Sequence, residues 1–411
     1  MDKLYKAIPY LIAVMGVFSC QQWLEIPVTN QALDWLCQFS ILGIFAWMAF
    51  RSRNLPQYRM PWQIVLYLAM VVLSAIYGLF MSEGYWDYKA LVTNFLTFAL
   101  CLSYFYFAQP SKVAVSLKVW LLVSFVVFWV LMPFMQGECI GRFMLPVSFL
   151  LILSPLFEKK SLIAILILSV LVIAFSAGGA RSNLLRFMFC LALGLGMAFR
   201  QHIPVPLLKC VVVIEFILPF VFMLLAVTGS FNIFQIGETL GAGDIEVRNS
   251  FDADNTEDLG ADTRTFIYIE EFASALNHGY ILQGRSMARG YDSEFFGNED
   301  IEMTGRGERG SSEVAILNVF NYFGVVGVII YFLLFAGAAV RVFLHSGNKV
   351  LYFIAIYIGF RWMWAFVEDF TRFDLNTICL WIALSMCYSP LFLKMDERGI
   401  CSWARQLLRL M

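Results

Sequence analysis

Long apolar segments alternate with short polar turns along almost the whole chain, and this pattern predicts a bundle of membrane-spanning helices. Most segments are continuous runs of about 20 apolar residues, the length that an α-helix needs to cross a bilayer. Membrane β-barrel strands would instead alternate apolar and polar positions. We predict about 12 spans, at about residues 7–18, 33–50, 62–81, 90–108, 114–135, 143–157, 162–177, 183–199, 205–227, 313–340, 350–367 and 376–393.

The composition supports this all-α polytopic membrane class and argues against a soluble protein. Hydrophobic residues make up 60% of the 411 residues, charged residues 14%, and the mean hydropathy is +0.73. Soluble proteins carry about 25% charged residues. Neither the nine cysteines nor the three histidines show a metal-binding spacing. We therefore expect one integral membrane domain over residues 1–411, with no metal, no cofactor and no nucleic-acid partner.

The basic residues are distributed unequally between the turns, and this predicts an orientation. One set of alternate turns carries most of the Lys and Arg, whereas the opposite set carries mainly Asp and Glu. Positively charged turns stay in the cytoplasm. Both termini are therefore predicted to be cytoplasmic, with the basic segment 394–411 lying against that leaflet. The polar run 229–312, between helices 9 and 10, is predicted to be a large periplasmic loop.

This loop is the only long polar stretch in the chain. It contains 16 Asp and Glu, six Arg and no Lys. We predict one amphipathic helix within it, at about residues 263–277, capped by Asp262 or Thr263 and ended by Gly279. We expect its apolar face to lie on the membrane or on the helix bundle. The residues of that face are Phe266, Ile269, Phe272 and Leu276.

Arginine side chains supply the candidate substrate-binding groups. Guanidinium groups stay charged and bind phosphate oxygens in pairs, so Arg without Lys favours a phosphate or carboxylate ligand. Each arginine taken alone is equally explained as an interfacial or solvated side chain. Arg361 and Glu368, seven residues apart, are expected to share a face and pair. The candidates for binding an anionic, lipid-linked substrate are Arg181, Arg186, Arg264, Arg285, Arg289 and Arg361.

Glu313 is the candidate catalytic residue, because it lies where the loop meets the next apolar segment. A carboxylate at this boundary can take a proton from a sugar hydroxyl. The alternative is a carboxylate that stabilises the start of a helix through the helix dipole. Glu313 is followed by Leu317, Gly324 and Gly327 at offsets +4, +11 and +14.

With this spacing and topology, the chain resembles the O-antigen polymerase and O-antigen ligase superfamily of bacterial inner-membrane glycosyltransferases. That family opens the helix after its large periplasmic loop with a His-Asn pair, then a Leu and two glycines at these offsets. Here Glu313 replaces the His and Val314 replaces the Asn. Residues 176–182 are similar to the family's Ser-x-x-Arg turn, and residues 263–285 to its Arg-helix-Gly segment.

The resemblance implies a polymerase of a surface polysaccharide such as O-antigen, capsule or exopolysaccharide. The donor would be an oligosaccharide on undecaprenyl diphosphate, and the partners would include membrane lipids, a chain-length regulator and a flippase. The first alternative is ligation of the glycan to lipid A or another acceptor, as in lipopolysaccharide assembly. The second is a transporter or flippase, against which the short connection after the sixth segment counts. The missing His favours the polymerase over the ligase.

Overall fold

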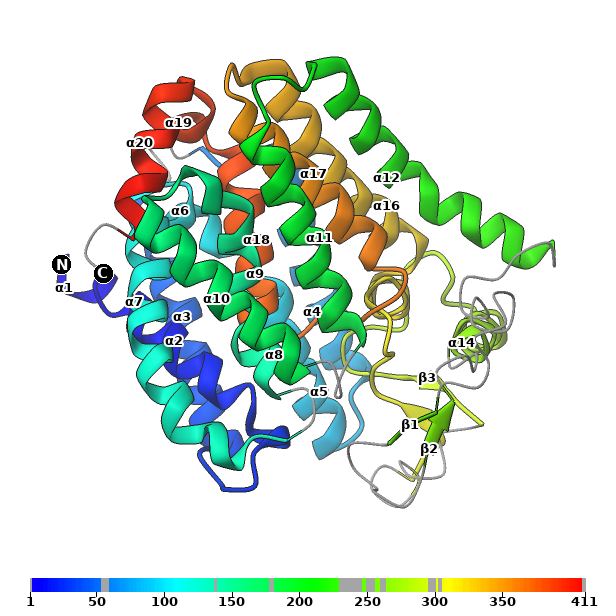
Figure 1. The fold of residues 1–411 in the computed structure, drawn as a ribbon. Helices are drawn as coiled ribbons and strands as arrows, with labels where there is room; N and C mark the ends of the chain where they lie inside the picture. Colours follow the sequence, from blue (N-terminus) through cyan, green and yellow to red (C-terminus); the bar gives the residue numbers. More distant parts are fainter. Residues whose placement is uncertain are drawn as a thin grey trace.

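The structure is a computed structural model, and it describes residues 2–52, 59–136, 139–176, 181–228, 246–248, 256–258, 264–294, 301 and 305–408. Helices dominate these residues, in agreement with the predicted all-α class (Figure 1). The strands among them form two short antiparallel pairs. β1 (Glu246–Arg248) pairs with β2 (Thr256–Asp258), and β3 (Tyr291–Asp292) pairs with β4 (Glu308–Arg309).

The helices follow the apolar segments of the sequence. Those before the loop are α1 (Asp2–Tyr5), α2 (Ile8–Phe18), α3 (Gln31–Ser52), α4 (Trp62–Met81), α5 (Tyr85–Phe98), α6 (Tyr104–Phe107), α7 (Pro110–Leu131), α8 (Cys139–Phe143), α9 (Leu145–Leu153), α10 (Lys159–Ser176), α11 (Arg181–Ala198) and α12 (Val205–Val227). Short 3₁₀ turns accompany them at η1 (Gln21–Trp23), η3 (Ala99–Ser103), η4 (Met132–Phe134) and η5 (Ser154–Leu156). The later helices are α14 (Thr265–His278), α16 (Ala315–His345), α17 (Lys349–Trp364), α18 (Leu375–Tyr388), α19 (Pro390–Leu393) and α20 (Glu397–Leu407).

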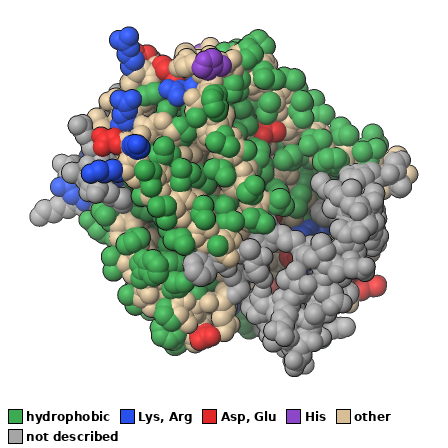
Figure 2. Space-filling view, viewed as in Figure 1, with side chains coloured by type: hydrophobic (Ala, Val, Ile, Leu, Met, Phe, Trp, Pro, Cys, Tyr) green, Lys and Arg blue, Asp and Glu red, His purple; other side chains and the backbone are tan. Residues whose placement is uncertain are grey.

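Several of these helices have the length and composition of membrane spans. Among the described residues six segments qualify, namely α3, α4, the α5–α6 segment, α7, α12 and α16. Figure 2 shows hydrophobic side chains over most of the visible face, with Lys and Arg gathered near α19 and α20. The protein is therefore an all-α membrane protein. The other predicted spans match shorter helices, such as the nine-residue α9, so the count of about 12 stays a prediction.

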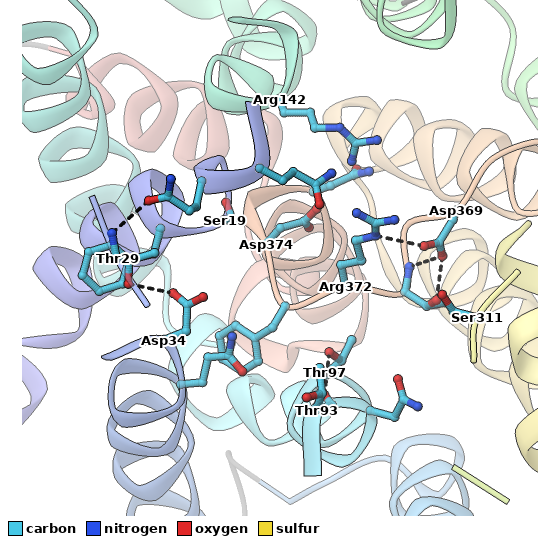
Figure 3. Close-up of a pocket in the computed structure, with 18 of the residues that line it drawn as sticks. Ser19, Thr29, Asp34, Thr93, Thr97, Arg142, Ser311, Asp369, Arg372 and Asp374 are labelled. Atoms are coloured by element: carbon cyan, nitrogen blue, oxygen red, sulfur yellow. Dashed lines mark hydrogen bonds and ion pairs between the residues drawn. The ribbon is translucent and has the colours of Figure 1, made fainter. Parts of the chain in front are cut away.

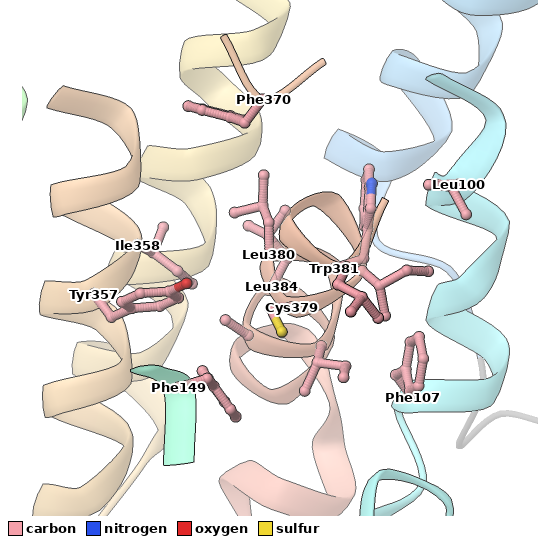
Figure 4. Close-up of a cluster of buried hydrophobic side chains, with 14 of the residues drawn as sticks. Leu100, Phe107, Phe149, Tyr357, Ile358, Phe370, Cys379, Leu380, Trp381 and Leu384 are labelled. Carbon is pink, nitrogen blue, oxygen red and sulfur yellow. The ribbon is translucent and has the colours of Figure 1, made fainter. Parts of the chain in front are cut away.

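α18 lies at the centre of the bundle. All of its 14 residues are buried. Figure 4 shows its side chains between those of α17, such as Tyr357, and those of η3 and α6, such as Phe107. Such close packing fixes the position of the connection between α17 and α18, which forms part of the site described below.

α16 is interrupted at Gly324, where the backbone adopts a non-helical conformation with φ +66° and ψ −166°. The interruption frees backbone groups that would otherwise bond within the helix, and membrane proteins tolerate this only where other protein groups replace those bonds. Residues 281–285 of the loop fill this role. The Val325 N–H donates to the Ile281 carbonyl at 2.8 Å, and the Arg285 N–H donates to the Asn321 carbonyl at 2.6 Å.

Glycines on both sides allow this close approach. A Cβ added to Gly284 would lie 2.5 Å from the carbonyl carbon of Tyr322, and a Cβ on Gly324 would overlap the carbonyl of Leu282. Gly324 also needs its left-handed φ. The sequence identified both glycines as parts of separate motifs, and the structure shows that the two motifs contact each other.

The loop helix α14 ends as predicted, and much of its apolar face is exposed. Gly279 ends the helix in the left-handed conformation, with φ +68°. The predicted caps, Asp262 and Thr263, lie outside the described residues; Arg264 occupies the N-cap without a side-chain cap. In the predicted apolar face, Ile269 and Leu276 are 64% and 67% exposed and do not pack on the bundle, whereas the ring centroids of Phe272 and Phe320 of α16 lie 5.0 Å apart. That the exposed part of this face lies on the membrane stays a prediction. The buried face instead consists of Ile267, Glu271, Ser274 and Ala275.

The bundle has two chemically different ends. We call the end that carries residues 264–294 and 305–312 the loop end, and the opposite one the basic end. At the basic end the Lys349 ammonium donates to the carbonyls of Arg200 and Ile203, both at 2.9 Å, and Arg200 pairs with Glu397 at 2.5 Å. The apolar face of α20 is buried, and its Trp403 indole donates to the Pro110 carbonyl at 2.8 Å. This face therefore packs on the bundle rather than on lipid.

Candidate functional site

A polar cavity of about 510 Å³ opens at the loop end of the bundle. On one side of the cavity lie the connection from α2 to α3 and the start of α3, and around it lie the middle of α5, α8, Ser311 and the connection from α17 to α18 (Figure 3). Charged groups from α3, α8 and the α17–α18 connection line it. They are Asp34, Arg142, Asp369, Arg372 and Asp374. The remaining polar lining includes Gln21, Gln22, Asn30, Gln31, Gln38, Thr93, Asn94, Thr97, Ser311, Thr371 and Asn376.

Asp369 is the most strongly hydrogen-bonded carboxylate of the cavity. It accepts hydrogen bonds from the Thr371 hydroxyl at 2.6 Å, the Thr371 N–H at 2.8 Å and the Arg372 Nε at 3.3 Å. Asn318 of α16 donates to the same carboxylate at 3.2 Å and to the Ser312 carbonyl at 3.0 Å. Asn318 therefore connects the end of the loop to the α17–α18 connection, and Asp369 acts mainly as the anchor of this wall.

Asp374 is better suited to exchange a proton with a substrate. It is half-buried at the N-cap of α18, where one carboxylate oxygen accepts the Thr377 N–H at 2.9 Å. Burial raises the pKa of Asp374 above its usual value, although the charges of Arg142 and Arg372 act in the opposite direction. A carboxylate with a raised pKa in a cavity is a candidate general base.

Arg142 and Arg372 give the cavity its positive charge. The Arg142 guanidinium lies over the Trp23 ring, 4.4 Å from its centroid, an arrangement that holds the cation in place. Arg372 approaches from the α17–α18 connection, and its side chain is 47% exposed. Figure 3 shows both side chains with Asp374 between them. The cavity therefore offers guanidinium groups and carboxylates side by side.

Glu313, the predicted catalytic residue, does not line this cavity. Its side chain is 48% exposed and pairs with Arg309 at 2.9 Å. α16 begins at Ala315 with Val314 as its N-cap, and no side chain caps it. Glu313 therefore lies just before the helix rather than in its first turn. Its predicted role stays a prediction.

The predicted arginines of the loop form ion pairs within the protein. Arg285 and Arg289 both bind the buried carboxylate of Glu308, Arg285 at 2.9 Å and Arg289 through its Nε, also at 2.9 Å. Arg285 also pairs with Asp292 at 2.8 Å. Bidentate carboxylate recognition is what Arg does better than Lys. These ion pairs explain why the loop contains Arg and no Lys, and the explanation does not require a phosphate ligand.

The same network ties the loop to the rest of the bundle. Arg306 pairs with Glu83 at 2.8 Å, in the turn between α4 and α5, and with Asp87 in the first turn of α5. Asp292, which binds Arg285 of this network, also pairs with His278 at the end of α14, at 2.5 Å. Burial tends to raise the pKa of Asp292, but the hydrogen bonds from Arg285 and His278 outweigh it and leave the pKa below its usual value.

The other predicted arginines lie apart from this network. Arg264 lies 3.6 Å from Glu368. The expected pair of Arg361 with Glu368 is wrong, because α17 ends at Trp364 and Arg361 instead donates to Asn376. Arg186 and Arg361 are buried inside the bundle. Arg181 opens α11, and its side chain lies outside the described residues.

Glu271 of α14 is a buried carboxyl group that the sequence did not single out. Its side chain is fully buried beneath the helix, and neither of its oxygens has a hydrogen-bond partner in the described structure. Burial raises the pKa of Glu271 well above its usual value. Burial therefore favours the neutral form of this carboxyl group.

The cavity-lining residues left a weak signal in the sequence. Polar groups recur at helical spacing within apolar segments, as at Asp34 and Gln38 or at Thr93 and Thr97. Polar residues at membrane depth face the bundle interior or a water-filled cavity. This pattern identifies the face of each helix, but which faces meet depends on the fold.

Comparisons with protein-family models, with curated proteins and with solved structures give no match for this chain. Its function therefore has to be inferred from the chemistry of the site itself.

Proposed function

We propose that this protein is a glycosyltransferase of the bacterial inner membrane that polymerises a surface polysaccharide. The cavity at the loop end carries the proposal. Its volume, about 510 Å³, is in the range of ligand pockets. Carboxylates, amides and hydroxyls in its wall match sugar hydroxyls, which both donate and accept hydrogen bonds. Trp23, Tyr322 and Phe373 add aromatic surface for the apolar faces of sugar rings.

The charged groups of the cavity support a transfer from a diphosphate. Asp374 would take the proton from an acceptor hydroxyl as its oxygen attacks the anomeric carbon of the donor. The bond between that carbon and the phosphate oxygen then breaks, and the diphosphate leaves with the bonding electrons. Arg142 and Arg372 would stabilise the charge that develops on the leaving group. Arg181, Arg264 and Glu313 remain candidates for holding the lipid-linked parts of the substrates.

The proposed function implies an orientation of the protein in the membrane. The loop end would face the periplasm, the basic end and both termini would face the cytoplasm, and the donor would be an oligosaccharide on undecaprenyl diphosphate. The Asn318 contacts support a common role for the loop and the cavity, because they join Ser312 to Asp369.

One feature favours a transporter as the second candidate. Interrupted membrane helices often form ion and substrate sites in transporters, and α16 is interrupted at Gly324. Here, however, residues 281–285 fill the interruption, and Gly324 does not line the cavity. The polymerase therefore remains the function that the site supports best.

The test is polymerisation by the purified protein in vesicles that contain its host's undecaprenyl-diphosphate repeat unit. We expect a ladder of longer lipid-linked glycans from the wild type and none from Asp374→Asn. Asp396→Asn is a matched control, since Asp396 also caps a helix, α20, but at the basic end. It should polymerise normally.

Other outcomes would contradict the proposal in distinct ways. A ladder from Asp374→Asn would remove the role of that carboxylate. Transfer only after lipid A is added would indicate a ligase. Movement of the intact lipid across the bilayer without a new product would indicate a transporter. Normal polymer from Arg181→Ala and Arg264→Ala would remove these two arginines from the site.

A further inference from the structure

Two arginines are enclosed in the interior of the helix bundle, away from the cavity lining. Arg186 of α11 is 3% exposed and Arg361 of α17 is 0% exposed. Charged side chains at such positions are normally paired with an opposite charge or bind a ligand. The described residues show no salt bridge to either guanidinium group within 4.0 Å.

Each guanidinium has one amide acceptor and further donors without a partner. Arg186 donates to the Asn183 Oδ1 at 3.1 Å, and its Nε has no acceptor. Arg361 donates to the Asn376 Oδ1, and its Nε and Nη2 have no acceptor. The Asn183 Nδ2 and the Tyr357 hydroxyl are also buried without a partner. Five buried donor atoms therefore belong to four side chains of this region, and the two amide oxygens already accept.

These groups lie close together. Tyr357 and Arg361 are one turn apart on the same face of α17. Arg186 lies about one turn before Phe189 on α11, and Arg361 directly follows Phe360 on α17. Next to them the rings of Phe189 and Phe360 stack with centroids 3.8 Å apart, so α11 and α17 are in direct contact here.

Among the described residues, no carboxylate lies within 4.0 Å of either guanidinium group. The carboxylates of the nearby α17–α18 connection have other partners: Glu368 lies 3.6 Å from Arg264, Asp369 accepts hydrogen bonds from Thr371 and Arg372, and Asp374 caps α18. A buried water molecule could accept hydrogen bonds from the free donors, but it carries no net charge. An anion satisfies both the free donors and the excess positive charge.

We propose that α11, α17 and α18 enclose a binding site for a chloride-sized inorganic anion between Arg186 and Arg361. The free groups of the site are donors, as an anion requires, and the Tyr357 hydroxyl is the one among them that can also accept a hydrogen bond. Neither arginine lines the 510 Å³ cavity. A bound anion would fix the packing of α11 on α17, and it does not depend on the proposed glycosyltransferase activity.

Thermal unfolding of the purified protein tests the site without any glycan substrate. Chloride is varied at constant ionic strength, with gluconate as the replacement anion. A ligand that binds only the folded state stabilises it in proportion to the logarithm of its excess concentration, so we expect the midpoint to rise by roughly 3–6 °C over a hundred-fold range of chloride. Bromide should act in the same way. Dialysis equilibrium with radiolabelled chloride should give about one retained ion per chain.

Variants distinguish a specific site from a general salt effect. Tyr357→Phe removes one donor and keeps the ring, so it should weaken chloride binding by about ten-fold or more. Arg361→Gln should abolish the chloride dependence. Arg405→Gln, an exposed arginine of α20, should retain it in full. The proposal is overturned if Tyr357→Phe binds chloride like the wild type, if no labelled chloride is retained, or if sulfate and phosphate stabilise where chloride does not.

Discussion

The contact of residues 281–285 with the interrupted helix predicts that Gly324→Ala destabilises the loop. At φ +66° and ψ −166° the backbone lies in a region that is essentially restricted to glycine, so an alanine costs about 1–3 kcal/mol. The added Cβ would also overlap the Leu282 carbonyl and lie 2.6 Å from the Gly284 nitrogen. Because both of these are backbone atoms, no side-chain rotation relieves the contact, and the segment has to move away.

That movement breaks the hydrogen bonds between Val325 and Ile281 and between Arg285 and Asn321, each worth about 1 kcal/mol. The total is about 3–5 kcal/mol, which corresponds to a fall in the unfolding midpoint of roughly 5–15 °C.

Two measurements check this expectation. Circular dichroism at a fixed heating rate gives the unfolding midpoint in detergent. Trypsin cleavage after Arg285 and Arg289, which are both buried in the native loop, reports whether residues 281–285 have left the helix. Gly43→Ala is the control, because a Cβ at this position of α3 meets nothing within 4 Å. If Gly324→Ala unfolds and is cleaved like the wild type, the close approach is not what holds this segment.

Two further predictions concern the loop carboxyl groups. Between about pH 4.3 and the higher pKa of buried Glu271, the folded state holds the extra proton, so stability falls as pH rises. Glu271→Gln should make the unfolding midpoint less dependent on pH between about 5 and 8, and an unchanged slope would contradict this. Glu308→Gln should remove the buried carboxylate that Arg285 and Arg289 share and cost about 3–5 kcal/mol, whereas Glu313→Gln, at an exposed pair, should cost about 1 kcal/mol or less. Equal unfolding midpoints for the latter two variants would refute the difference.

The sequence predicted those elements whose form depends on local pattern. α4 and α12 coincide with continuous apolar segments, and Gly279 ends α14, because length, hydropathy and a left-handed cap are properties of neighbouring residues. The sequence did not predict the buried face of α14, because the helix buries Glu271 and Ser274 there. A hydrophobic pattern assigns such residues to solvent, and only the tertiary contact with α16 reverses the assignment.

The candidate site was predicted only in part for the same reason. Its lining comes from segments near residues 18–38, 93–97, 142, 311 and 369–376, which no local motif joins. The arginines of the loop were predicted to bind an anionic substrate, whereas in the structure two of them have a partner within the protein. That partner is Glu308 for Arg285 and Arg289, and pairing across 19 or more residues cannot be read from composition.

The interruption of α16 also bears on the order in which the chain is made. Residues 281–285 precede Gly324, so the segment that fills the gap is synthesised before the helix it completes. When Val325 and Val326 enter the bilayer, acceptors for their N–H groups already exist on the same chain. The insertion of α16 therefore requires no later part of the chain to bind the backbone N–H groups freed at Gly324. A shortened loop that lacks residues 281–285 would leave these N–H groups without acceptors already during biosynthesis, and not only in the finished fold.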